Sequence, residues 1–145
     1  MSDLTDERTE ALRDIPLFEL LTAEELSLVG GAAKERRFDT GDAIVTEHEA
    51  GLGFMVVIEG EARVELRGER VAALTPGSSF GDSSLFEELP RAFSVVAEAP
   101  TRVLAILPWQ FTPLLDQHPE MSLKLAKGLA RRLRALEEER VPADG

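Results

Sequence analysis

The chain has 145 residues, of which 43% are apolar, so it is long enough to bury the core of one domain of ordinary size. Acidic residues outnumber basic ones by 27 to 16, and the formal net charge of −11 argues against a nucleic-acid-binding surface, because phosphate contacts need clustered cations. The absence of cysteine excludes disulfides and thiolate sites, and the two histidines, His48 and His118, cannot form a multi-histidine metal site. No apolar run approaches the ~18 residues of a membrane span, and the N-terminus is acidic and polar. We therefore expect a cytoplasmic protein with no membrane or nucleic-acid partner and no metal.

Short helices are expected before residue 34. The acidic stretch 3–14 predicts the first helix. Thr22 and Glu25 have the spacing of a capping box, in which each end of the pair satisfies a backbone N–H of the other. A second helix is therefore expected over about 23–29, ending at the glycine pair Gly30-Gly31.

Residues 34–107 predict β-structure, because short β-rich segments alternate with turn signals. The expected strands lie within ERRF, AIVT, FMVVIEG, EARVEL, RVAAL, FSVVAE and TRVLAIL. Regular short strands of this kind favour an antiparallel sandwich or jelly-roll barrel over a parallel α/β sheet. The segment 81–91, GDSSLFEELPR, interrupts the rhythm and predicts a turn, one helical turn and a proline.

Two more helices are expected over residues 108–140. Pro108 suits the first position of a short helix that continues to Leu115, and Pro119 suits the start of a longer helix that ends near Arg140. The expected architecture is a single, mainly β domain over 1–145. It consists of N-terminal helices in 1–33, a jelly-roll β-barrel in 34–107 and C-terminal helices in 108–140.

The segment 81–91 carries the residue types that a phosphorylated sugar needs. A helix that begins after a glycine presents free N–H groups, which suit an anion. Arg91 could clamp a phosphate through two hydrogen bonds, and Asp82 could accept hydrogen bonds from a sugar hydroxyl. The alternative is an ordinary loop in which Arg91 forms a surface pair with a glutamate.

This segment resembles the phosphate-binding cassette of cyclic-nucleotide-binding domains, whose pattern is F-G-E-x-A-L, a short spacer and P-R-x-A-[ST]-V. Phe80-Gly81-Asp82 corresponds to F-G-E, and Arg91 falls nine residues after Asp82, a spacing found in the family. Further segments resemble glycine-containing turns of the family: 40–44, 54–62 and 74–77. The resemblance covers about residues 13–140 and implies the same jelly-roll fold.

The resemblance also implies a role for each cassette residue. Arg91 would pair with the cyclic phosphate, and Asp82 would bind the ribose 2′-hydroxyl. Backbone N–H groups nearby would complete the phosphate cradle, and Ala92 is similar to members that prefer cAMP over cGMP. The expected ligand-binding residues are Gly81, Asp82, Ser83, Ser84, Arg91 and Ala92.

Three features depart from the family pattern. Asp82 is one methylene shorter than the usual glutamate, and Phe93 replaces the usual alanine. On a strand, Phe93 would share a face with Arg91 and point into the barrel, where its ring would fill space that a nucleotide needs. Leu136 and Glu137 stand where the catabolite activator protein of this family offers hydroxyls to adenine.

Two functions remain open on these residues. The first is a sensor or regulatory domain that binds a cyclic nucleotide, with cAMP favoured over cGMP, and that has no catalytic activity and no cofactor. The alternative is a degenerate domain that binds no nucleotide and acts as a protein-interaction or dimerisation module. Asp82 and Phe93 distinguish the two.

A competing motif is the G-x-S-x-G sequence at 77–81, which would make Ser79 a hydrolase nucleophile. Asp116 and His118 follow in hydrolase order, but a spacing of two residues suits a catalytic pair poorly. The chain also lacks the alternating strands and helices of that fold, so we expect no enzyme.

The C-terminal helix carries a short apolar seam with a/d spacing, formed by Ala126, Leu129, Leu133 and Leu136. Family members often dimerise through this helix, so we expect a weak homodimer through these four residues, together with a protein partner. The alternative is an amphipathic face that docks on the barrel. The arginines in 131–134 precede Glu137–Glu139, so pairing such as Arg134 with Glu138 is expected rather than a nucleic-acid contact.

Overall fold

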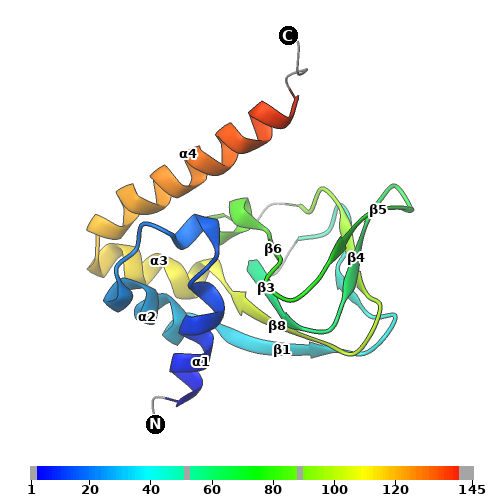
Figure 1. Cartoon of the computed structure of the whole chain (residues 1–145), viewed down its shortest axis with the longest axis horizontal. Coiled ribbons are helices and arrows are strands. Elements are labelled where there is room, and N and C mark those ends of the chain that lie inside the picture. The colour runs from blue at the N-terminus through cyan, green and yellow to red at the C-terminus, as the bar shows by residue number, and fades with distance from the viewer. Residues whose placement is uncertain (1–2, 51–52, 88–89, 141–145) are drawn as a thin grey trace.

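The computed structural model describes residues 3–50, 53–87 and 90–140, and in this part of the chain eight strands form two antiparallel sheets (Figure 1). The strands are β1 (Lys34–Phe38), β2 (Ala43–Val45), β3 (Phe54–Glu59), β4 (Ala62–Leu66), β5 (Glu69–Leu74), β6 (Ser79–Phe80), β7 (Ser94–Ala97) and β8 (Thr101–Ile106). The helices are α1 (Asp3–Leu12), α2 (Ala23–Ala32), α3 (Pro108–Gln117) and α4 (Glu120–Arg140), with 3₁₀ turns η1 (Pro16–Phe18) and η2 (Asp82–Leu85). Gly51, a turn signal between two of the expected strands, and the cassette residues Glu88 and Leu89 lie outside the described residues.

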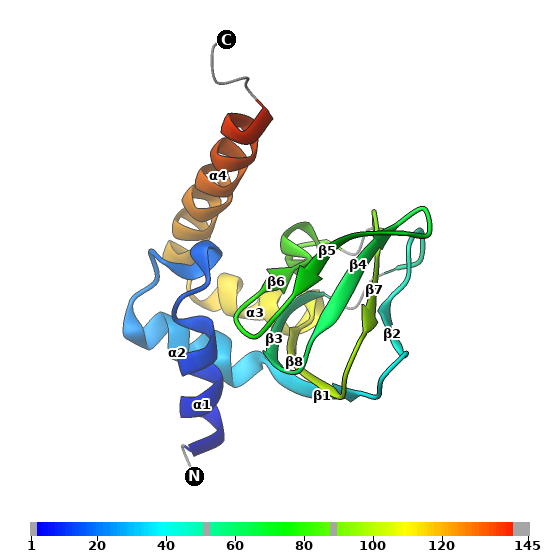
Figure 2. The same ribbon diagram turned by 45° about the vertical axis from the view of Figure 1, so that its right-hand side comes forward.

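The two sheets have the strand orders β1-β8-β3-β6 and β2-β7-β4-β5. The four α-helices gather on one side of the strands (Figure 2). This arrangement confirms the expected jelly-roll fold flanked by helices. None of the helices in the described part of the chain has the length and apolar character needed to cross a bilayer.

Strand β3 divides the core into two parts, because alternate side chains point to opposite faces of its sheet. Phe54 and Val56 pack with the helices, whereas Met55 and Val57 pack in the barrel interior against the second sheet. All four side chains are fully buried. A strand covered on both faces explains why FMVVIE is a continuous apolar run instead of an alternating one.

Helix α2 begins as expected but ends later than expected. The Thr22 hydroxyl accepts a hydrogen bond from the Glu25 N–H at 3.1 Å, and the Glu25 carboxylate accepts one from the Thr22 N–H at 2.9 Å, so the capping box is confirmed. The prediction that the helix ends at Gly30-Gly31 is wrong, since α2 continues to Ala32. A Cβ at Gly30 would lie 2.5 Å from Oγ1 of Thr9, so this glycine permits close packing of α1 on α2 rather than ending the helix.

The buried contacts of helix α4 lie in its first half. Met121 and Leu125 are fully buried, and a Cβ at Gly128 would lie 2.5 Å from the carbonyl oxygen of Leu17 in η1. Residues 131–139 are all exposed, and the helix extends away from the body of the molecule (Figure 1). The docked amphipathic face therefore accounts for the first half of α4, whereas Leu133 and Leu136 in the second half are left exposed by the described part of the chain.

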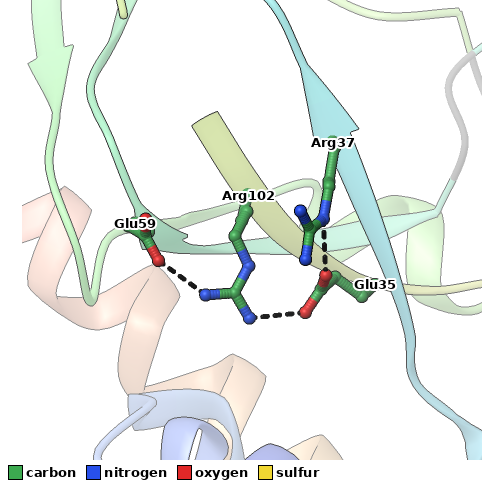
Figure 3. A network of polar contacts seen from close by, with 4 residues as sticks. All are labelled: Glu35, Arg37, Glu59 and Arg102. Atoms are coloured by element: carbon green, nitrogen blue, oxygen red, sulfur yellow. Dashed lines mark hydrogen bonds and ion pairs between the residues drawn. The ribbon is translucent and has the colours of Figure 1, made fainter. Parts of the chain in front are cut away.

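A network of charged side chains ties three strands together at one end of the first sheet (Figure 3). Arg102 of β8 donates to Glu35 of β1 and to Glu59 of β3, each at 2.6 Å, and Arg37 donates to the other oxygen of Glu35 at 3.0 Å. The hydrogen bonds from Arg102 and Arg37 lower the pKa of Glu35 to about 2, and the two carboxylates raise the pKa of Arg102.

Candidate functional site

The candidate site is built around the loop that joins β6 to β7. Gly81 has φ of +87°, a left-handed conformation that favours glycine, and the single helical turn expected here is η2. Leu85 at its end is fully buried among the side chains that pack with the helices. The ring of Phe86 packs edge-to-face on Phe111 of α3, with ring centroids 5.8 Å apart. The cassette is therefore fixed to the helical layer.

Arg91 lies inside this site and is only 5% exposed. Its Nη2 donates to the carbonyl oxygen of Gly53, and its guanidinium carbon lies 5.9 Å from the centre of the Phe80 ring. A Cβ at Gly81 would collide with Nη1 of Arg91, so only glycine leaves room for the guanidinium. The burial contradicts the alternative of an exposed surface pair and places the cation against the start of η2.

Arg91 and Phe93 precede β7, so the prediction that they share a strand face is wrong. The backbone of Arg91 instead pairs with the opposite loop: the His48 N–H donates to the Arg91 carbonyl at 2.8 Å, and the Arg91 N–H donates to the Glu49 carbonyl at 2.9 Å. Phe93 is half-buried, and its ring lies 6.5 Å from that of Phe80 in an edge-to-face contact. Its ring thus fills part of the barrel beside the arginine, although the chain bends there instead of continuing as a strand.

Asp82 faces helix α4. Its Oδ2 lies 3.2 Å from Nε of Arg132, and the Asp82 side chain is 19% exposed. The carboxylate expected to bind a ribose hydroxyl is therefore already paired with a cation of the chain. The pair links the cassette directly to the C-terminal helix.

The two arginines nearest to Arg132 in this helix pair differently. Arg134 contacts Glu138 at 3.2 Å, which confirms the expected pairing within the helix. Arg131 instead reaches Glu19, just after η1, at 2.7 Å. Only one of the three arginines thus follows the local charge pattern.

Three residues are expected to offer backbone N–H groups to a phosphate: Ser83, Ser84 and Ala92. Ser83 and Ala92 are exposed, whereas Ser84 is buried. The Ser84 N–H donates to the Gly81 carbonyl at 2.9 Å and so closes the turn of η2. This N–H is engaged within the loop.

The hydrolase alternative lacks its structural context. Ser79 lies in β6 and pairs with Val56 in an antiparallel sheet, not on a turn between a parallel strand and a helix. Within the described ranges, no group of three or more His, Asp or Glu side chains is placed to hold a metal ion.

Residues 35–118, which include the whole cassette, match the family model described as a cyclic nucleotide-binding domain. The chain belongs to the cyclic nucleotide-binding domain family.

Two curated proteins and one solved structure that resemble the chain support this assignment. A cAMP-dependent protein kinase regulatory subunit of Mycosarcoma maydis is 34% identical over 113 residues, which cover 72% of the chain and 22% of that protein. The Cyclic AMP receptor protein of Thermus thermophilus is 32% identical over 133 residues, which cover 88% of the chain and 62% of that protein. Among solved structures, the N-terminal domain of a transcriptional regulator from Streptomyces coelicolor A3(2) has a TM-score of 0.81 at 28% identity, covering 93% of this chain and 96% of that one. The chain thus spans only part of these two curated relatives.

Two residues shape the site of this cyclic nucleotide-binding domain without having been predicted. Gly53 has φ of +76° and accepts the hydrogen bond from Arg91; a Cβ there would collide with the Ile106 carbonyl. A glycine between apolar positions is a detectable signal of such a close approach. Arg132 gives no local signal, because 50 residues separate it from Asp82.

Proposed function

We propose that this cyclic nucleotide-binding domain is a regulatory domain that binds cAMP in the cassette between β6 and β7. The observation that carries the proposal is the buried guanidinium of Arg91, which packs against Gly81 at the start of η2. The named relatives include a cAMP-dependent kinase regulatory subunit and a Cyclic AMP receptor protein, which supports cAMP over cGMP. Ala92 supports the same preference.

In this proposal Arg91 holds the cyclic phosphate. Its hydrogen bond to Gly53 fixes the plane of the guanidinium and sets Nη1 beside Gly81. Asp82 accepts a hydrogen bond from the ribose hydroxyl and gives up its ion pair with Arg132. The exchange costs little, because a partly exposed ion pair contributes at most about 1 kcal/mol.

Titration calorimetry of the whole chain with cAMP, cGMP and a cyclic dinucleotide tests the proposal. We expect cAMP to bind more tightly than the other two. Arg91→Gln should weaken cAMP binding by a factor of thirty or more, because truncating one partner of a buried charge pair costs roughly 2–5 kcal/mol. Arg134→Gln, on the exposed part of α4, is the control and should bind like the parent.

Circular dichroism must first show that Arg91→Gln is folded, because Arg91 is buried. A folded Arg91→Gln variant with unchanged cAMP affinity would disprove the cassette assignment. The conservative change Arg91→Lys keeps the charge and loses the planar fork, so we expect intermediate affinity.

A degenerate interaction module is the second candidate, and two contacts favour it. Phe93 packs on Phe80 inside the barrel, where its ring fills space that a nucleotide would need. Arg132 pairs with the Asp82 carboxylate, which a nucleotide would otherwise use. A wild-type protein that gives no binding heat with any of the three nucleotides would favour this candidate. Either function is compatible with a homodimer through α4, where Leu133 and Leu136 are exposed.

A further inference from the structure

A cavity of about 470 Å³ lies beneath α1, between the segment 7–15 and the helix-facing side of the first sheet. Its apolar wall includes Ile58 of β3 and Leu104 of β8, with Ala11 on the helix opposite. No cassette residue lines it. The cavity is therefore separate from the candidate nucleotide site.

The cavity exists because α1 packs on α2 more than on the sheet. Thr9 approaches Gly30 of α2, and Nη1 of Arg8 donates to the Ala33 carbonyl at 2.9 Å. Leu12 is fully buried, whereas the methyl group of Ala11 is too short to fill the space above Leu104. The sequence of α1 thus leaves part of the sheet face uncovered.

The lining of the cavity has a net negative charge. It contains four carboxylates and two arginines, giving a net charge of −2. Both terminal nitrogens of Arg102 are bound by Glu35 and Glu59 (Figure 3). Glu7 and Asp14 are exposed, and their carboxylates take part in none of the ion pairs or hydrogen bonds found among the described residues.

We propose that this cavity binds a small organic cation with an apolar body, such as an alkylammonium or arylammonium ion. The ammonium group lies near Glu7 and Asp14, and the apolar body lies on Ile58 and Leu104. An anion would face the same carboxylates, and both arginines of the lining already donate hydrogen bonds, Arg102 to two carboxylates and Arg8 to the Ala33 carbonyl. The volume falls within the roughly 300–1,000 Å³ typical of small-molecule sites.

Three probes with the same apolar body test which ligand charge the cavity prefers: 4-phenylbutylamine, 4-phenylbutanol and 4-phenylbutyrate. Binding to the ¹⁵N-labelled whole chain is followed by amide chemical shifts at low salt. We expect the amine to bind about ten-fold more tightly than the alcohol and the carboxylate to bind most weakly, with shifts centred on Ala11, Ile58 and Leu104. Added salt should reduce the advantage of the amine, because the carboxylates are exposed to solvent.

Glu7→Gln/Asp14→Asn should remove most of the preference for the amine over the alcohol. Both positions are exposed, so the variant should fold like the parent. Glu61→Gln/Glu69→Gln is the matched control, since it removes the same charge at exposed positions outside the cavity. Ala11→Leu should weaken all three probes together by filling the cavity.

The proposal is overturned if none of the three probes shifts the cavity amides, or if amine and alcohol bind equally. It is also overturned if the control variant lowers the preference as much as Glu7→Gln/Asp14→Asn does. In that case the overall charge of the protein, and not the cavity, attracts the amine. None of these outcomes depends on whether the cassette binds cAMP.

Discussion

The carboxylate of Asp82 pairs with Arg132 of helix α4 and, in the proposed function, is also the group that binds the ribose. Aspartate has a shorter reach than the glutamate of the family pattern, and here it meets Arg132 at 3.2 Å. The Arg132 side chain is 44% exposed, so water screens the pair and its contribution is at most about 1 kcal/mol. A ligand that offers two or three hydrogen bonds can displace it.

We predict that Arg132→Gln raises cAMP affinity by about two- to five-fold, because the variant no longer has to break the pair before Asp82 binds the ribose. Arg134→Gln in the same helix should leave the affinity unchanged, since Arg134 pairs with Glu138. Calorimetric titration measures both. A loss of affinity in Arg132→Gln would instead mean that Arg132 contacts the nucleotide.

Residues of the site differed in how far the sequence could predict them. Gly81, Asp82 and Arg91 lie close together in the chain, so glycine position and spacing were enough to group them. The contact of Asp82 with Arg132 depends on the direction in which α4 leaves its contact with η1, which no local pattern encodes. The ring of Phe93 packs in the barrel as predicted, but strand alternation is the wrong reason, because the chain bends before β7 begins.

At the scale of elements, the hydrogen bonds of Arg102 to Glu35 and Glu59 connect β8 to β1 and β3 where the apolar part of the sheet face ends. Arg102 and Arg37 hold the pKa of Glu35 at about 2, below the unfolded value of 4.5. A depressed carboxylate pKa means that the ionised form is favoured in the folded state. The resulting stability is present above pH 4.5 and is lost as the pH falls toward 2.

We predict that Glu35→Gln lowers the free energy of unfolding at pH 7 by about 1 kcal/mol, a modest value because the side chain is 28% exposed. The difference from the parent should shrink as the pH falls from 4.5 toward 2. Urea unfolding at several pH values measures this, with Glu69→Gln on β5 as the control. A deficit that stays constant down to pH 2 would indicate lost packing rather than lost charge.

Helices and strands with a clear hydrophobic periodicity or a helix-capping motif were predictable. Features that depend on contacts with another helix or strand were not. The Thr22–Glu25 capping box fixed the start of α2, but the end of α2 depends on Gly30 meeting Thr9 of another helix. Strand β6 has only two residues, too few to show an alternation, and it forms because β3 offers backbone partners.

At the scale of the whole molecule, the projecting half of α4 carries a short apolar seam that the described part of the chain leaves exposed. Leu133 is 59% exposed and Leu136 is 45% exposed, whereas Leu129 of the same seam packs partly on the core. Two such seams would bury apolar area, but the loss of translational freedom and the net charge of −11 oppose association. Added salt screens that repulsion.

We therefore predict a weak homodimer that dissociates on dilution and tightens with added salt. Leu133→Glu should give a folded monomer, because it places a charge at the centre of the seam. Leu123→Glu is the matched control: Leu123 is 62% exposed on the same helix but lies outside the seam. Sedimentation velocity distinguishes the species, and a parent protein that stays monomeric at high concentration and high salt would refute the dimer.

A tilt of α4 about the close contact of Gly128 with Leu17 would move different points of the helix by different amounts. Arg132 lies four residues beyond Gly128, and the last helical residue, Arg140, lies twelve residues beyond it. These separations correspond to about 6 Å and about 18 Å along the helix axis. A tilt that separates Arg132 from Asp82 by about 1 Å therefore moves the far end of the helix by about 3 Å, roughly the length of a hydrogen bond. The movement at the far end is larger because Gly128 lies nearer to Arg132 than to Arg140. A shift at the cassette that is too small to make or break a contact there would therefore be large enough to do so at the far end of α4.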